Sequence, residues 1–220
     1  MMRRALLLLG LAPFVANAQP QRMEIVLERL QGTTWQAVDP ALVLASGDRI
    51  RFRFHSNFDG YLYVMNQGSS GKYEQLFPRE ETGQANQIAA GKDYQVPATS
   101  TVFRIAGPPG YETVYWLVSP VKLTDAQRPG PPPASAAPSA PVKLIPRCDD
   151  AVLKARGDCV DSAAGPKLIP RGADIPKNIS GAFDPGPREL LFLRDQNKAV
   201  ISSPEPLTGP VVYQFRVAHK

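Results

Sequence analysis

The chain has 220 residues, of which 43% are hydrophobic and 20% are charged, and its formal net charge is +5. The length is enough for one large domain or two small ones. The basic excess is small and is not concentrated as it is in nucleic-acid-binding proteins, so we expect no nucleic-acid partner.

The first 18 residues have the pattern of a signal peptide. Arg3 and Arg4 precede an apolar run over residues 5–15, and Ala16-Asn17-Ala18 suits a signal peptidase. We expect cleavage after Ala18, which lowers the net charge from +5 to +3 because two arginines are removed. The mature protein is then periplasmic or secreted. No other stretch approaches the roughly 20 apolar residues of a membrane span, so we expect no transmembrane segment in the mature form.

The main part of the fold, residues 19–125, is predicted to consist of short β-strands. Apolar and charged residues alternate in MEIVLERL (23–30) and RIRFRFH (49–55). Asp59-Gly60 favours a hairpin between the second run and YLYVMN (61–66). Further short runs separated by Gly and Pro turns extend to Pro120. The pattern predicts an all-β, antiparallel β-sandwich that is immunoglobulin-like in outline.

Small motifs in this region resemble a known bacterial family. They are Gly47-Asp48, Gly60 to Val64, Leu76-Phe77-Pro78, Ile88 with Gly91, Tyr94 with Pro97, and Gly107 to Glu112. Their order resembles the domain of unknown function 4384 family over about residues 42–120. The resemblance implies a β-rich extracytoplasmic module without assigned activity, which occurs beside catalytic domains in other proteins. It brings no catalytic residues.

Residues 126–187 are predicted to leave the sandwich as a long Pro-rich excursion. They hold twelve of the 23 prolines. The stretch RPGPPPASAAPSAP has little to bury and is expected to be a spacer that reaches up to about 40 Å.

The two cysteines, Cys148 and Cys159, lie within this excursion, on either side of a predicted short helix. A redox-active pair or half of a metal site are alternatives, but the spacing is far from C-x-x-C and no His is near. A disulfide that stabilises the loop by roughly 3 kcal/mol is the preferred interpretation.

The pentapeptide KLIPR occurs twice, at residues 143–147 and 167–171. Leu-Ile before Pro favours extended backbone, so each copy is predicted to be an edge strand or a short linear motif. The preferred interpretation is that both copies lie along the sandwich surface. The alternative is a bivalent ligand in which Ile145 and Ile169 engage two sites on a partner.

Residues 188–220 return to a strand pattern. Val211, Tyr213, Phe215 and Val217 share one face of the last run. Because two or three isolated strands rarely hold in water, we expect these C-terminal strands to dock on the sandwich.

The best candidate binding surface is a basic row on one strand. Arg49, Arg51 and Arg53 share a face, His55 ends it and Arg104 is expected to continue it on a neighbouring strand. Such a row attracts anionic envelope polymers or an acidic partner protein, although a solvated outer face has the same pattern.

The expected function is a non-catalytic interaction or accessory module of the bacterial envelope, with no cofactor and no metal. A carbohydrate-binding module is the alternative, and its candidate residues are Tyr61, Tyr63, Tyr73 and Tyr111. A hydrolase is the least supported class, because no nucleophile with its base and no cluster of metal ligands is visible.

Overall fold

A computed structural model describes residues 20–79, 85–98, 101–134, 144, 151–170, 172–173, 175–182 and 190–220. The predicted signal peptide, residues 1–18, lies outside the described residues. Within the described ranges, none of the helices has the length and apolar character needed to cross a membrane.

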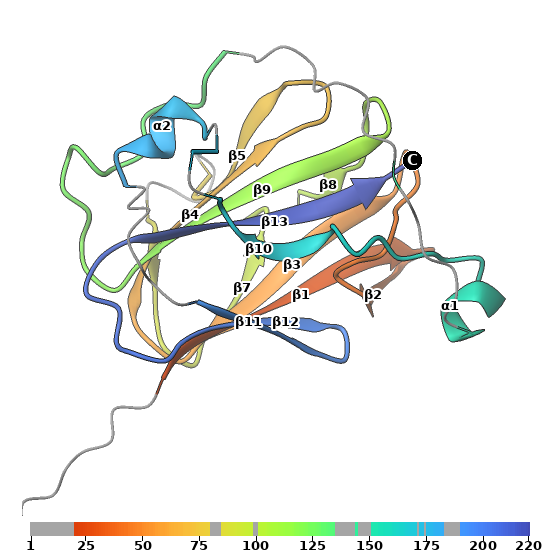
Figure 1. Ribbon diagram of the computed structural model, residues 1–220, viewed down its shortest axis with the longest axis horizontal. Coiled ribbons are helices and arrows are strands. Elements are labelled where there is room, and N and C mark those ends of the chain that lie inside the picture. Colours follow the sequence, from red (N-terminus) through yellow and green to blue (C-terminus); the bar gives the residue numbers. More distant parts are fainter. Residues whose placement is uncertain are drawn as a thin grey trace, which may run out of the picture.

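Two antiparallel sheets make up nearly all of the regular secondary structure in the described residues (Figure 1). The first has seven strands: β11 (Leu191–Asp195), β12 (Lys198–Ser203), β1 (Gln21–Gln31), β3 (Arg49–Ser56) and β7 (Asp93–Val96) in that order, with β2 (Thr34–Val38) beside β1 and β8 (Phe103–Arg104) beside β3. The second has six strands: β10 (Gly165–Leu168), β13 (Val211–His219), β9 (Gly110–Ser119), β4 (Gly60–Gln67) and β5 (Tyr73–Phe77) in that order, with β6 (Gln87–Ile88) beside β4. Two short helices are α1 (Ala151–Ala155) and α2 (Lys177–Ser180). The predicted all-β class with two antiparallel, sandwich-like sheets is confirmed.

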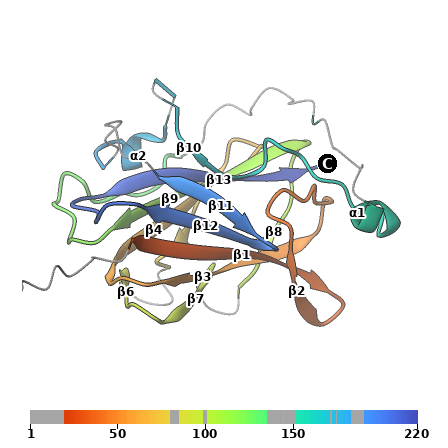
Figure 2. The same cartoon turned by 60° about the horizontal axis from the view of Figure 1, so that its bottom comes forward.

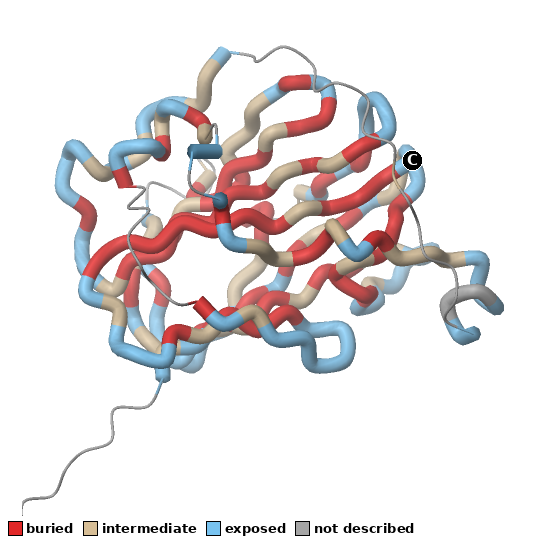
Figure 3. The backbone as a smooth tube through the Cα atoms, viewed as in Figure 1, coloured by how far each residue is buried: buried red, intermediate tan, exposed pale blue. Residues whose placement is uncertain are grey.

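The core lies between the sheets, because every second residue of the main strands points inward. Figure 3 shows buried segments running through both layers. Phe52 of β3 makes edge-to-face contacts with Trp116 of β9 and Phe215 of β13, with ring centroids 5.7 and 5.2 Å apart. All three side chains are fully buried. These aromatic contacts join the sheets and stabilise them beyond the burial of area alone.

The C-terminal strands take part in both sheets (Figure 2). β12 pairs with β1, where Met23 lies opposite Ile201. β13 pairs with β9 over its whole length, with Phe215 opposite Val114. The first and last thirds of the described chain therefore share one hydrophobic core.

The hairpin predicted at Asp59-Gly60 is wrong. β3 and β4 lie in different sheets, so the turn between them crosses from one layer to the other. Gly60 is needed there because the backbones of β4 and β9 lie close together, and not because of a hairpin turn. A Cβ on Gly60 would lie 2.5 Å from the backbone oxygen of Ser119. The apolar faces of the two strands therefore face each other across the core.

The second KLIPR copy lies against the six-stranded sheet. Lys167 and Leu168 belong to β10, which pairs with β13. Ile169 is buried in a small cluster on the outer face of that sheet, where α2 contributes Ile179. The first copy lies outside the described residues except for Leu144, which packs beside Ala164 and Ala218.

Only one of the two cysteines of the predicted disulfide lies among the described residues. Cys159 is not a free thiol, and its backbone oxygen accepts a hydrogen bond from the Val43 N–H at 2.8 Å. Cys148 lies outside the described residues. The pairing therefore stays a prediction, as does the Pro-rich spacer, of which only the part up to residue 134 is described.

Candidate functional site

The predicted basic row does lie on one face of β3. Arg49, Arg51 and Arg53 alternate with the buried Ile50, Phe52 and Phe54. The row therefore occupies the outer face of the seven-stranded sheet.

A buried carboxylate on the neighbouring strand neutralises part of this row. Glu28 of β1 is 5% exposed, and its two carboxylate oxygens accept from Arg51 Nε at 2.5 Å and from Arg53 Nε at 2.8 Å. The Arg51 guanidinium also stacks over the Trp35 ring, 4.3 Å from the ring centroid. These charge-assisted hydrogen bonds hold both arginines on the sheet and reduce their attraction for an outside anion.

The ends of the row differ. Arg49 lies directly opposite Arg104 of β8, and among the described residues neither has an ion-pair partner. His55 at the other end lies 3.1 Å from Asp93, between Nδ1 and Oδ1. In the described part of the chain, Arg49 and Arg104 are therefore the members of the row without an ion pair. The other two candidate residues are elsewhere: Ile169 is buried under α2, and Ile145 is outside the described residues.

A buried polar cluster, which the sequence analysis missed, closes one end of the core. Glu112 accepts from Asn66 Nδ2 at 2.8 Å and lies 3.3 Å from Nε2 of the fully buried His219. Ser69 donates to Glu112 from its backbone N–H at 3.3 Å and from its hydroxyl at 3.4 Å. Because the Ser69 hydroxyl bonds to the acid rather than to the histidine, these residues do not form a nucleophile with its base. They link β4, β9 and β13 where the strands end.

The described surface has a groove on the outer face of the six-stranded sheet. Its volume is about 510 Å³. Tyr61 and Tyr63 of β4 form part of its lining, with Gln75 of β5 and Asn86 beside them. The opposite wall is the segment from Lys122 to Pro132. The two tyrosines come to lie together because residues two apart on a strand share a face, while Leu62 and Val64 point into the core.

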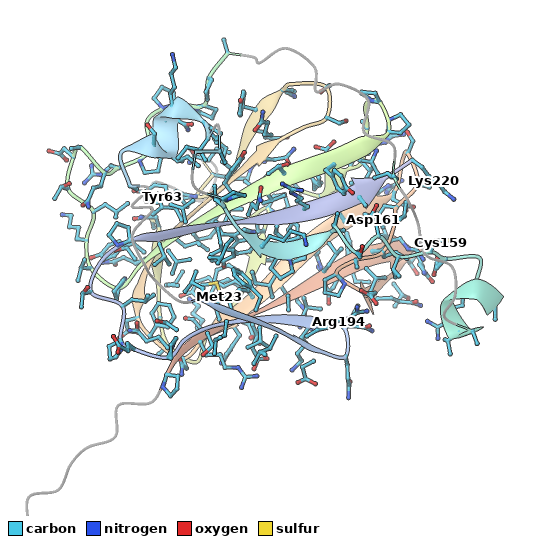
Figure 4. The ribbon with its side chains drawn as sticks, viewed as in Figure 1. Met23, Tyr63, Cys159, Asp161, Arg194 and Lys220 are labelled. Carbon is cyan, nitrogen blue, oxygen red and sulfur yellow. The ribbon has the colours of Figure 1, made fainter. Side chains whose placement is uncertain are left out.

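The groove is aromatic and positively charged. Lys122 and Arg128 belong to its lining, and no acidic residue does among the residues described. Burial raises the pKa of Tyr63, and the positive charge of Arg128 acts in the opposite direction. Tyr63 also packs beside the cluster that holds Ile179 of α2 (Figure 4). Such a surface can stack flat, ring-shaped groups and can pair with anions.

The other two tyrosines proposed for carbohydrate binding do not line this groove. Tyr73 packs against the cluster beneath α2. Tyr111 donates from its hydroxyl to Asp161 at 3.0 Å, and burial together with this hydrogen bond raises the pKa of Tyr111 to about 12. The contact fixes the segment before β10 onto β9.

The basic row lies wholly within the segment between Val43 and Lys122, and the groove lies partly within it. Residues 43–122 match the family model described as domain of unknown function (DUF4384). The predicted resemblance is confirmed for this segment, which is less than half of the chain. It contains both groove tyrosines, whereas Arg128 lies beyond it. No curated protein and no solved structure matches the chain significantly.

Sequence reasoning missed Lys122, Arg128 and the Pro-Gly-Pro-Pro segment at residues 129–132 as groove residues. The Pro-rich composition predicts an extended segment without a core of its own, which is compatible with both a free spacer and a wall laid against a sheet. Only the contact with β4 distinguishes the two. A groove of this kind leaves a weak signal in the sequence, namely two tyrosines at the outward positions of an otherwise apolar strand.

Proposed function

We propose that this protein is an extracytoplasmic, non-catalytic binding module of the bacterial envelope, and that the groove over β4 binds an anionic envelope polymer. The observation that carries the proposal is the groove lining, in which two tyrosines and two cations meet and, among the described residues, no acid takes part. Concave sites with aromatic walls and a few placed polar groups are the usual form of ligand sites in proteins.

The groove is a better candidate than the arginine row. Arg51 and Arg53 are engaged by Glu28, so an anion that binds them must compete with a buried carboxylate 2.5 to 2.8 Å away. Among the residues that the structure describes, the ion pair of Arg128 is a longer contact, 3.6 Å, to the exposed Asp125. Exposed ion pairs of this length contribute little and are easily exchanged. The remaining cations of the row, Arg49 and Arg104, lie opposite each other on the outer face of the seven-stranded sheet.

The non-catalytic role is supported by the chemistry of the lining. Tyrosine rings, amides and prolines bind by contact and hydrogen bonding, and the two cations supply charge. The His219 and Ser69 side chains belong to the buried cluster and not to the groove.

Affinity capture tests the proposal. The full mature chain is immobilised and exposed to native envelope extract at about 50 mM and about 300 mM salt, because screening separates charge-driven binding from the rest. We expect a polymer to be retained at low salt and released at high salt. The double variant Lys122→Gln/Arg128→Gln should lose this retention, whereas the matched variant Arg49→Gln/Arg104→Gln should keep it. Equal retention by the groove variant and the wild type would refute the groove as the site.

Two structural parts of the proposal are tested separately. We propose that Cys148 and Cys159 form a disulfide that closes the excursion, and secreted protein should therefore react with alkylating reagents only after reduction. We also propose that the signal peptide is cleaved after Ala18. Sequencing of the exported protein should give Gln19 as the first residue, and an intact Met1 would contradict export by this route.

A further inference from the structure

We propose that the groove binds an acidic glycan chain, whose sugar rings stack on Tyr61 and Tyr63 and whose acid groups pair with Lys122 and Arg128. This inference rests on the proposed function and names the ligand class of the same site. It brings together in one place two recognition modes that the sequence predicts for different surfaces.

The tyrosine pair is positioned for a chain rather than for a single ring. Tyr61 and Tyr63 are two residues apart on β4, which places their side chains on the same face roughly 7 Å apart. Both are half-buried, so their rings are held by neighbours and still exposed to the groove. The Tyr61 hydroxyl accepts from Gln87 Nε2 at 3.3 Å, which helps to orient the ring. The apolar C–H face of a sugar packs on such a ring, and two rings contact successive units.

The two cations of the lining favour an acidic glycan over a neutral one. Arg128 lies close enough to Tyr63 for its charge to oppose the rise in the pKa of the tyrosine hydroxyl. A guanidinium beside a stacking ring can pair with a carboxylate, a sulfate or a phosphate on the same sugar unit. Lys122 adds a second positive charge in the lining. A neutral glycan would leave both cations unused.

The amides of the groove suit hydroxyl-rich ligands. Gln75 and Asn86 lie beside the tyrosines, and an amide side chain both donates and accepts hydrogen bonds, as a sugar hydroxyl does. Gln75 donates from Nε2 to the backbone oxygen of Pro78 at 2.8 Å, so its side chain is held in place before a ligand arrives. A ligand that carried only charge, such as polyphosphate, could accept from the amide N–H groups but would leave both tyrosine rings unused.

Calorimetric titration of the full mature chain with defined probes tests the ligand class. The probes are oligogalacturonate as the acidic glycan, maltoheptaose as the neutral glycan and polyphosphate as an anion without sugar. We expect oligogalacturonate to bind most tightly and its affinity to fall with added salt. Tyr61→Ala/Tyr63→Ala should weaken it about tenfold, as expected for the loss of two stacked rings.

Conservative variants separate the contributions of ring, hydroxyl and charge. Tyr61→Phe/Tyr63→Phe keeps the rings and should bind within about twofold of the wild type, because stacking needs no hydroxyl. Lys122→Gln/Arg128→Gln changes two exposed side chains and should fold normally, weaken binding about fivefold and flatten the salt dependence. Arg49→Gln/Arg104→Gln removes the same amount of charge from the other sheet and should change neither the affinity nor its salt dependence.

Three results would overturn the inference. Maltoheptaose binding as tightly as oligogalacturonate would remove the need for the acid, and tight polyphosphate binding that ignores the Tyr→Ala variant would show that charge alone acts. The third result is that oligogalacturonate does not bind, while capture of an envelope polymer still depends on Lys122 and Arg128. This result would refute the acidic glycan as the ligand and would leave the groove as the binding site. Capture that does not depend on these two residues would refute the proposed function itself.

Discussion

Replacing Phe215 by alanine probes whether the C-terminal strand shares the core of the first hundred residues. Phe215 lies at the middle of β13, is fully buried and makes its ring contact with Phe52 of β3 in the opposite sheet. A phenylalanine side chain buries at least about 150 Å², which at about 25 cal/mol per Å² corresponds to nearly 4 kcal/mol of transfer free energy. Alanine retains a small part of this, while the cavity adds a cost. We therefore expect a loss of about 3–5 kcal/mol in the free energy of unfolding.

Urea denaturation followed by tryptophan fluorescence measures this loss, because Trp116 lies in the same aromatic cluster. Arg216→Ala on the outer face of β13 is the matched control, and we expect it to change the free energy by less than about 1 kcal/mol. The midpoint should shift strongly for the first variant and little for the second. A loss below about 1 kcal/mol for Phe215→Ala would contradict a core shared between β13 and β3.

Three further predictions follow from single contacts. Gly60→Ala should lower the free energy of unfolding by about 2–3 kcal/mol, because the new Cβ would lie 2.5 Å from a backbone oxygen of β9. Gly130→Ala is the control: a Cβ there has nothing within 4 Å, so the same urea assay should show almost no change. Ile169→Asp should lower the melting temperature by placing a charge in an apolar cluster, and Leu168→Asp, at a half-exposed neighbour, should leave it nearly unchanged. Because the pKa of Tyr111 is raised from 10.0 to about 12, the folded state holds its proton more tightly than the unfolded state. This contribution to stability is complete below pH 10 and is lost as the pH rises towards 12. Melting temperatures measured between pH 8 and 12 should therefore begin to fall near pH 10, and the fall should be smaller in Tyr111→Phe.

The strand pattern could be predicted from the sequence because alternation is a local property. Ile25 and Leu27 on β1, or Tyr213 and Phe215 on β13, alternate with outward residues, and period two places them on one face. The order of small motifs was also sufficient to predict the family of residues 43–122.

Pairing between strands could not be predicted in the same way. Asp59-Gly60 has the composition of a hairpin turn, but it connects two sheets, because Gly60 is packed against a third strand, β9. Composition indicates that the chain turns at this point, but it does not indicate which strand the next segment pairs with. The same limit applies to Glu28, whose alternating position on β1 suggests an exposed residue, although its carboxylate is buried between Arg51 and Arg53.

The candidate site was predicted only in pieces. The sequence indicated tyrosines for sugars, arginines for anions and a Pro-rich spacer as three separate features. The fold places Tyr61 and Tyr63 against Arg128 and the prolines that follow it. This proximity depends on where residues 122–132 return along β4, and no local pattern specifies that path.

The most direct test of the binding groove is a nuclear magnetic resonance titration of the isotopically labelled mature chain with oligogalacturonate. We predict that the largest amide shift changes fall on β4 around Tyr61 and Tyr63, on Gln75 and on the segment from Lys122 to Arg128. Changes centred on the arginine row of β3, or on the edges of the sheets, would contradict the groove as the binding site.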